Sequence, residues 1–175
     1  MSVVATIYNS KGLYGSVKPI TGIPQIKVFR EEGWEADAPN DYHCTICYDQ
    51  SVMVPRESID VMATRARVGD TTVFRAFPAG GLQAWSNDGK LYVGIEMYSP
   101  ELFSLREHIQ ATLNVKSSFD IYKCHITLGK FRGFPEAMLQ DLQACRQFVA
   151  SNVSLEAPLP GLIELSYLRF EDAKK

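Results

Sequence analysis

The sequence predicts an α+β domain made of two similar halves, and three observations support this prediction. Short segments with the character of β-strands alternate with segments of helical periodicity, so neither kind of element dominates. The 175 residues are typical of one domain, and 46% of them are apolar, which is enough for a packed core. A unit made of a strand with His-x-Thr, a loop and a helix that begins at proline occurs twice. We therefore expect one domain over residues 1–175 with two similar lobes.

The first third of the chain is expected to consist mainly of strands separated by glycine and proline turns. The expected strands are VVATIYN, GLYGSVKPI and QIKVF, followed by the polar loop REEGWEADAPND and a strand at Tyr42–Tyr48. A helix is predicted at Pro55–Arg67. Proline suits the first helical turn, and Ile59, Met62 and Ala66 fall on one face.

The rest of the chain alternates between strands and two further helices. The turn sequence Asn87-Asp88-Gly89 predicts a hairpin between two of the strands. Leucine and isoleucine at helical spacing predict a buried stripe on the first helix, and the second begins after a proline. In order, the expected elements are strands Thr71–Pro78, Leu82–Trp85 and Leu91–Tyr98, helix Pro100–Leu113, strand Tyr122–Gly129, helix Pro135–Ala150, and strands Val153–Leu155 and Leu162–Phe170.

The repeated motif reads His43-Cys44-Thr45-Ile46 in the first half and His125-Ile126-Thr127-Leu128 in the second. Side chains in a strand alternate between two faces, so each motif presents an imidazole and a hydroxyl on one face and apolar groups on the other. Two halves packed about a pseudo-twofold axis would bring both polar faces to one place.

Two imidazoles can supply an acid and a base together near neutral pH, and hydroxyl groups can donate to phosphate oxygens. The pattern therefore predicts phosphodiester cleavage without a metal or another cofactor. The sequence does not assign acid and base, because the two half-sites look alike locally. The third histidine, His108, lies in a helical segment without the motif, and we expect it at the surface.

Two other interpretations of these residues exist. Each His and Thr can be an ordinary half-buried strand residue, although the doubled pattern disfavours this. The second is a zinc site, for which the cysteine and histidine types would suit. However, Cys44 and Cys47 are an odd number of residues apart, so regular alternation would put them on opposite faces. The candidate zinc set would be His43, Cys44, Cys47, Cys124 and His125.

The bulk composition restricts the partners. A net charge of −2 and a pI near 5.9 argue against a long nucleic acid, and are compatible with a small anionic ligand. The sequence shows neither an export signal nor an apolar run long enough to cross a bilayer. We therefore expect a cytoplasmic protein that has no membrane partner and keeps its four cysteines as thiols. The oligomeric state is not predicted.

The segments HCTI and HITL, at this separation and each followed by a helix, resemble the 2H phosphoesterase superfamily, which includes LigT-like RNA ligases and cyclic phosphodiesterases. The resemblance spans most of the chain. It implies a bilobal α+β fold with two β-sheets and flanking helices around a central cleft. It also implies metal-independent chemistry by four matched residues, His43, Thr45, His125 and Thr127.

Within that superfamily, the size, the early KGLYG segment and the charge most resemble the phage anti-CBASS hydrolases, which destroy cyclic di- and trinucleotide immune signals. This resemblance implies cleavage of 3′–5′ linkages in the host cytoplasm through a 2′,3′-cyclic phosphate. The alternatives are RNA-end processing, a 2′,3′-cyclic phosphodiesterase or 2′–5′ RNA ligase-like enzyme, and a non-catalytic nucleotide sponge.

Residues outside the motifs are candidates for substrate binding. Tyr14 lies between two glycines and Trp85 precedes a hairpin turn, where each can stack on a base, an interaction of about 1–3 kcal/mol per base. Glu164 alternates with apolar residues in the last strand and can accept a hydrogen bond from an exocyclic amine. Lys123 and Lys130 flank the second motif and can raise the local positive potential.

Overall fold

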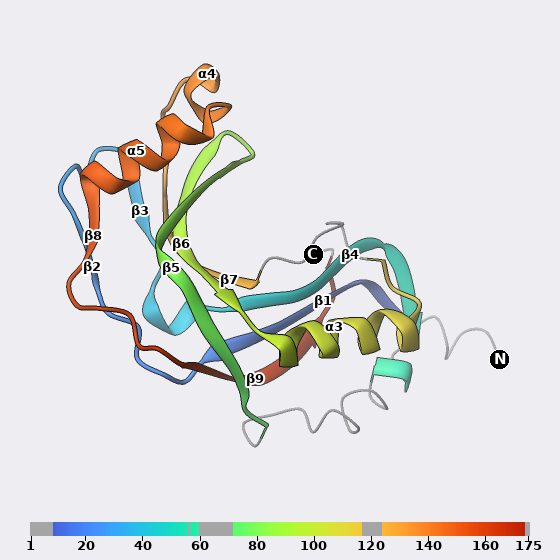
Figure 1. Cartoon of the computed structure of the whole chain (residues 1–175). Coiled ribbons are helices and arrows are strands. Elements are labelled where there is room, and N and C mark those ends of the chain that lie inside the picture. The colour runs from blue at the N-terminus through green and yellow to red at the C-terminus, as the bar shows by residue number, and fades with distance from the viewer. Residues whose placement is uncertain (1–8, 56, 60–71, 117–123, 174–175) are drawn as a thin grey trace.

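The computed structural model describes residues 9–55, 57–59, 72–116 and 124–173 (Figure 1). Its strands are β1 (Asn9–Pro19), β2 (Ile26–Val28), β3 (Trp34–Ala36), β4 (Cys44–Pro55), β5 (Phe74–Asn87), β6 (Lys90–Tyr98), β7 (Cys124–Phe131), β8 (Val153–Leu155) and β9 (Ile163–Glu171). Its helices are the short 3₁₀ helix η1 (Pro39–Asp41), α3 (Pro100–Leu113), α4 (Glu136–Leu139) and α5 (Leu142–Asn152). The α+β class predicted from the sequence is thus confirmed.

Seven strands form one antiparallel sheet in the order β3-β7-β4-β1-β9-β5-β6, and β2 pairs with β8 separately. β6 also pairs with β7, so the strand pairings form a closed circuit. Along this circuit, the trio β9-β1-β4 is followed by the trio β7-β6-β5, and the motif strands β4 and β7 are the adjoining ends of the two trios. One continuous sheet therefore joins the two halves, and the expected division into two β-sheets is not confirmed.

The two trios are joined at two places. β4 and β7, which carry the motifs, pair at Cys44 and Ile126. β5 and β9 pair over three residues, Phe74 to Ala76 of β5. Long strands supply most of the other pairing, and in Figure 1 the β5–β6 hairpin extends from the region of β9 and α3 to the region of α5. Both motifs therefore lie where the two halves meet.

Two hydrophobic clusters fill the interior, and each is associated with a different helix. Helix α3 contributes Leu102 and Ile109 to the larger cluster, which also contains side chains from β1, β4, β7 and β9. Helix α5 contributes Cys145 and Val149 to the smaller cluster beside β6 and the end of β7. Figure 1 shows the two helices at separate ends of the sheet. The larger cluster contains side chains of both trios of strands, so the two clusters do not correspond to two halves.

Local sequence explains where α3 begins and ends. The Ser99 hydroxyl accepts a hydrogen bond from the Leu102 N–H, and Pro100 occupies the first turn, where its missing N–H costs nothing. Asn114 ends the helix in the left-handed conformation with φ of 52°, which asparagine tolerates better than most residues. The predicted helix Pro100–Leu113 is confirmed residue for residue.

Several other element predictions need correction. The helix predicted at Pro135–Ala150 is interrupted, because the Asp141 carboxylate accepts the Ala144 N–H and starts a new helix there. The two strands expected on either side of Gly80 are one strand, β5, with a shift of register between Pro78 and Leu82. A short strand, β3, lies in the expected loop.

The predictions for the first two strands and the first helix can be tested only in part. β1 covers most of GLYGSVKPI, whereas most of VVATIYN lies outside the described residues. Pro55 ends strand β4 instead of opening a helix, residues 57–59 are helical, and the rest of the predicted helix lies outside the described part of the chain. A search of the described residues finds no helix with the length and apolar character to span a membrane.

Candidate active site

The two His-x-Thr segments lie side by side, because Cys44 and Ile126, the middle residues of the two motifs, are paired. Opposed residues in an antiparallel pair point to the same face, and their neighbours along each strand point to the other. Cys44 and Ile126 are fully buried, so the other face is the open one. The half-exposed side chains of that face are His43, Thr45, His125 and Thr127.

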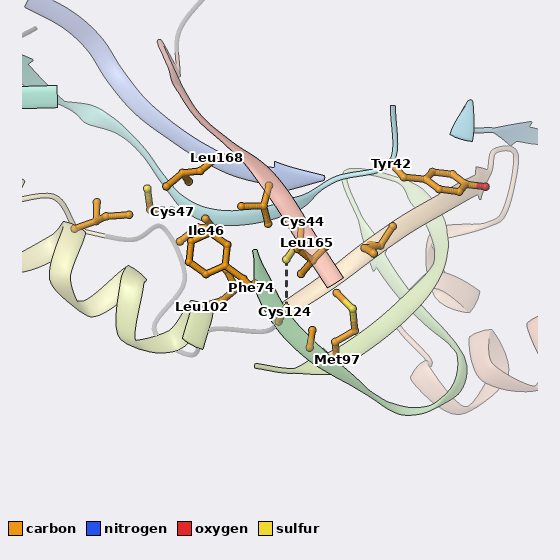
Figure 2. Close-up of a cluster of buried hydrophobic side chains, with 14 of the residues drawn as sticks. Tyr42, Cys44, Ile46, Cys47, Phe74, Met97, Leu102, Cys124, Leu165 and Leu168 are labelled. Carbon is orange, nitrogen blue, oxygen red and sulfur yellow. Dashed lines mark hydrogen bonds between the residues drawn. The ribbon is translucent and has the colours of Figure 1, made fainter. Parts of the chain in front are cut away.

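The face behind the motifs is part of the larger core. Cys44 Sγ lies 3.3 Å from Cys124 Sγ, so the thiols of the two motif strands touch directly beneath the polar residues (Figure 2). Both side chains are buried, together with Ile46. The packing of this core therefore determines how close the two strands lie.

A β-bulge follows the first motif immediately. Thr45 and Cys47 pair with successive residues of β1, so the register passes over Ile46. Because of the bulge, Cys44 and Cys47 are both buried, and the expectation that they lie on opposite faces is wrong. Burial raises the pKa of the Cys47 thiol to about 12, so this thiol stays protonated at neutral pH.

A second bulge follows the second motif at the same position. Thr127 and Gly129 pair with successive residues of β6, and the register passes over Leu128. In both motifs the extra residue is therefore the apolar one directly after threonine. Bulges bend and twist a strand and re-aim side chains next to active sites. This gives a structural reason for the repeated pattern of histidine, threonine and a following large apolar residue.

In the first half-site, the imidazole of His43 is fixed by the backbone. Its Nδ1 lies 2.8 Å from the carbonyl oxygen of Asp41. A carbonyl only accepts hydrogen bonds, so Nδ1 carries the proton and Nε2 is the atom that exchanges protons with a ligand. The ring of Tyr14 makes an edge contact with His43, with centroids 6.3 Å apart.

Tyr14 also contacts the motif threonine. Its hydroxyl lies 2.8 Å from Thr45 Oγ1. Burial is the main cause that raises the pKa of Tyr14, and the hydrogen bond to Thr45 only partly opposes this rise. Tyr14 therefore stays neutral at physiological pH and can donate to Thr45. Tyr14, a predicted substrate-binding residue, thus lies beside the first motif.

In the second half-site, His125 packs against the indole of Trp85, with ring centroids 4.8 Å apart and the planes at 66°. Gly94 makes this contact possible. A Cβ at that position would lie 2.7 Å from Trp85 Cη2 and 2.2 Å from the carbonyl oxygen of Ile126. The indole thus crosses β6 over a position without a side chain. Glycine inside a strand indicates such a close approach. Gly94 is therefore the sequence feature that could have indicated packing of another side chain across β6.

The matched bulges also reveal an aromatic residue that sequence reasoning missed. Tyr14 is opposite Tyr48 on β4, and Tyr92 is opposite Lys130 on β7. Tyr48 and Lys130 each follow the threonine of their motif by three residues. Tyr92 is thus the counterpart of Tyr14, and its ring is nearly parallel to that of Trp85 at 6.1 Å. Lys130 Nζ lies 6.0 Å from the centre of the Tyr92 ring.

Asp37 is a second residue that the sequence did not single out, and its backbone is bonded to the second motif strand. Its backbone N–H donates to the carbonyl of Leu128, the bulged residue of β7, at 2.9 Å. Burial raises the pKa of the Asp37 carboxyl, and the positive charges of Lys130 and His43 oppose that rise. An acidic group is therefore near enough to Lys130 and to His43 for both to influence its pKa.

The other predicted ligand residues are placed differently. Glu164 pairs with Arg75 where β9 meets β5, with strand β1 between it and β4. Lys130 lies 3.9 Å from Glu35 Oε2, so its charge is partly compensated. Lys123 lies outside the described residues. His108 is exposed on α3, as expected.

No cluster of three or more His, Cys, Asp or Glu side chains suited to a metal ion occurs in the described part of the chain. Four thiols are present there, those of Cys44, Cys47, Cys124 and Cys145, and all are buried and free of disulfides.

Comparison with known proteins identifies the fold. No family model matches the sequence, and no curated protein is significantly similar to it. Among solved structures, Usb1 from Kluyveromyces marxianus matches with a TM-score of 0.53 and 11% identity over 95% of this chain and 96% of that one. The same protein with uridine monophosphate matches with a TM-score of 0.58 and 10% identity over 96% of each chain. This chain is therefore similar in fold to Usb1 over nearly its whole length.

Proposed function

We propose that this protein is a 2H-type phosphodiesterase that cleaves a 3′–5′ linkage in a short nucleotide substrate by acid–base catalysis. The observation that supports it most is the pairing of Cys44 with Ile126, because it puts both imidazoles on one open face. In this proposal the catalytic residues are His43 and His125, assisted by the hydroxyls of Thr45 and Thr127.

The chemistry follows from the groups on that face. One imidazole takes the proton of a ribose 2′-hydroxyl, whose oxygen attacks the adjacent phosphorus. The other imidazole donates a proton to the departing 5′-oxygen as the P–O bond breaks, which leaves a 2′,3′-cyclic phosphate. His43 Nε2 suits either role, because Nδ1 is held by the Asp41 carbonyl. The threonine hydroxyls donate to non-bridging oxygens, and Tyr14 orients that of Thr45.

The 3′ end of a short RNA is the substrate that we favour. Usb1 is a U6 snRNA 3′-end phosphodiesterase of the 2H phosphoesterase superfamily, and one of its matching structures holds uridine monophosphate. The aromatic rings of Tyr14, Trp85 and Tyr92 around the two histidines provide faces on which bases can stack. Glu164 and Lys123 remain candidate contacts for the rest of such a ligand.

A cyclic di- or trinucleotide, as in the anti-CBASS hydrolases of phage, is the second candidate. The net charge of −2 favours it, because a compact ligand needs few basic contacts. The fold comparison does not support this narrower assignment, and it favours RNA-end processing instead. A non-catalytic sponge would use the same open face but leave its ligand intact.

Chromatography of products separates these candidates. The protein is incubated in excess EDTA with short oligouridine RNA and with a panel of cyclic di- and trinucleotides. We expect shortening of the RNA from its 3′ end, with conversion that persists under chelation. His43→Ala and His125→Ala should each lower the rate by about 10²–10⁴-fold, and His108→Ala serves as the matched control.

Other outcomes have definite meanings. Conversion of cyclic nucleotides alone would identify the second candidate. Ligand that is captured and recovered intact, with capture unchanged in the His43→Ala, His125→Ala double variant, would identify a sponge. Full activity in that double variant, or activity abolished by EDTA, would contradict the proposed mechanism.

A further inference from the structure

Two aromatic side chains of the open face lie outside the site described above. Phe77 of β5 and Tyr98 of β6 are opposite each other in the sheet. They are unusually accessible for large aromatic residues, with 45% of Phe77 and 67% of Tyr98 exposed. Opposed residues point to the same face, so the two rings form one aromatic surface.

This pair belongs to the same face as the candidate catalytic residues. Glu96 is opposite His125 across the β6–β7 pair. Tyr98 follows Glu96 by two residues in a regular strand, so it shares that face and lies about 7 Å farther along it. The burial along β6 agrees, since Leu91, Val93, Ile95 and Met97 are buried, whereas Tyr92, Glu96 and Tyr98 on the other face are exposed or half-exposed.

Aromatic groups therefore flank His125 in both directions along β6. Tyr92 lies about 13 Å from the Glu96 position in the direction away from Tyr98. Trp85, the cross-strand partner of Tyr92, reaches back to contact His125. A phosphodiester at His125 carries a nucleoside on each side, and each nucleoside would meet an aromatic surface on this face.

We propose that Phe77 and Tyr98 form a second base-stacking platform, which binds a base of the ligand other than the one next to Trp85. This proposal rests on the proposed function and adds that the site recognises at least two nucleosides. The chemistry favours a base as the occupant, because aromatic rings stack on the faces of all four bases without sequence preference. Continuity with the face that carries His125 makes this platform part of one binding surface.

The exposed ring of Phe103 provides an internal comparison. It is 50% exposed, similar to Phe77, but it lies on helix α3, which packs on the opposite, core side of the sheet. If simple exposure of an aromatic residue were enough to bind a ligand, Phe103 would contribute equally. The proposal requires instead that only the pair on the open face contributes.

Binding measurements with ligands of different length test the proposal. The probes are uridine monophosphate and a 2′-O-methyl oligouridine of three nucleotides, which lacks the attacking hydroxyl and stays intact. We expect Tyr98→Ala and Phe77→Ala each to weaken binding of the trinucleotide about tenfold, and to change binding of the mononucleotide less than twofold. Tyr98→Phe keeps the ring and should bind as the unchanged protein does, and so should Phe103→Ala.

A fluorescent probe reports stacking directly and does not depend on catalysis. A trinucleotide with 2-aminopurine at one end loses fluorescence when that base stacks on a ring. We expect this quenching, at one of the two ends, to be lost in Tyr98→Ala and retained in Tyr98→Phe. Circular dichroism and thermal unfolding verify that the variants are folded.

The results distinguish the platform from the proposed function. If the unchanged protein binds both probes and Tyr98→Ala binds them equally well, the platform is overturned while the nucleotide site stands. Equal weakening of both probes would also overturn it. If Tyr98→Ala instead abolishes self-association and leaves trinucleotide affinity unaltered, the pair is a contact between copies of the chain. Failure of the unchanged protein to bind either probe would overturn both proposals.

Discussion

The Tyr14 hydroxyl lies 2.8 Å from Thr45 Oγ1, and this hydrogen bond connects a flanking aromatic residue to a motif side chain. The raised pKa of Tyr14 keeps this hydroxyl protonated throughout the range in which imidazole titrates. The hydroxyl of Thr45 is thereby directed toward the open face. At the scale of single residues, the first half-site is thus oriented by a neutral tyrosine and by the Asp41 carbonyl.

Replacement of Tyr14 by phenylalanine tests this orientation. The Tyr14→Phe variant keeps the ring that contacts His43 and removes only the hydroxyl. A neutral hydrogen bond contributes about 0.5–1.5 kcal/mol, so we expect kcat/KM to fall about 3- to 10-fold with little change in thermal stability. Steady-state kinetics on the substrate found by chromatography measure the effect, and Tyr167→Phe, at an exposed tyrosine of β9, is the control.

Because the pKa of Tyr14 is raised, its ionisation cannot limit activity below the usual tyrosine range near pH 10. The ratio between the unchanged protein and Tyr14→Phe should therefore stay constant from pH 5 to 9. A ratio that approaches one within this range would show that Tyr14 acts by another route.

The sequence was sufficient to identify the motif residues but not all of their neighbours. His43 and His125 stand out because histidine is rare in this chain and the pattern recurs. Tyr92 could not be chosen from the eight tyrosines without the register of β6 against β7, since only that register makes it the counterpart of Tyr14. Contacts across a sheet depend on pairing, which local patterns do not specify.

Strands β4 and β7 depart from regular alternation at equivalent places, directly after the motif threonines. Cys47 differs from its predicted position because an unbroken period of two would place it opposite Cys44, and the bulge breaks that period. Whether a strand accommodates an extra residue depends on its partner, and β4 and β7 have different partners, β1 and β6. By contrast, β6 and α3 were predicted closely, because a strong hairpin turn and a helix N-cap are encoded locally.

At the scale of elements, Gly94 is where three strands crowd together. In the Gly94→Ala variant, the new Cβ would lie 2.2 Å from the Ile126 carbonyl oxygen and 2.7 Å from Trp85 Cη2. We expect a loss of stability of about 1–3 kcal/mol, because β6 must move away from β7 or the indole must move. Urea unfolding measures the loss, and tryptophan fluorescence reports the displacement of Trp85.

Gly161→Ala is the matched control for this variant, because a Cβ at Gly161 meets no atom within 4 Å. The control should be as stable as the unchanged protein to within about 0.5 kcal/mol. If both variants had the same stability and fluorescence, the close packing of Trp85 across β6 would be contradicted.

At the scale of the whole molecule, Asp49 joins strand β4 to the segment after α3. It is 6% exposed, and its carboxylate accepts hydrogen bonds from the Ser51 N–H and hydroxyl and from the Lys116 N–H. Burial acts to raise the pKa of Asp49, but these hydrogen bonds outweigh it, and the pKa is lowered. Folding therefore favours the charged carboxylate.

The sign of the pH dependence follows from this lowered pKa. The stabilisation is complete above the unfolded pKa, near 4, and is lost as the pH falls through the lower folded value. Asp49→Asn should destabilise the protein at pH 7 by about 1–3 kcal/mol. The difference from the unchanged protein should shrink as the pH is lowered toward 2.

Urea unfolding across this pH range measures the difference, with Asp88→Asn in the exposed β5–β6 turn as the control. Parallel curves for Asp49→Asn and the unchanged protein would contradict the role assigned to the charge.

The contact between β4 and β7 has a consequence for how this protein would tolerate substitutions. His125 lies in β7 and His43 directly precedes β4, each strand belongs to its own trio, and the pairing of Cys44 with Ile126 joins the two strands. The distance between the two imidazoles of the proposed mechanism is thus governed by the packing of the larger cluster, which contains the buried residues of both motif strands. We expect a conservative substitution in this cluster directly behind the motifs to alter turnover before it alters ligand affinity or melting temperature.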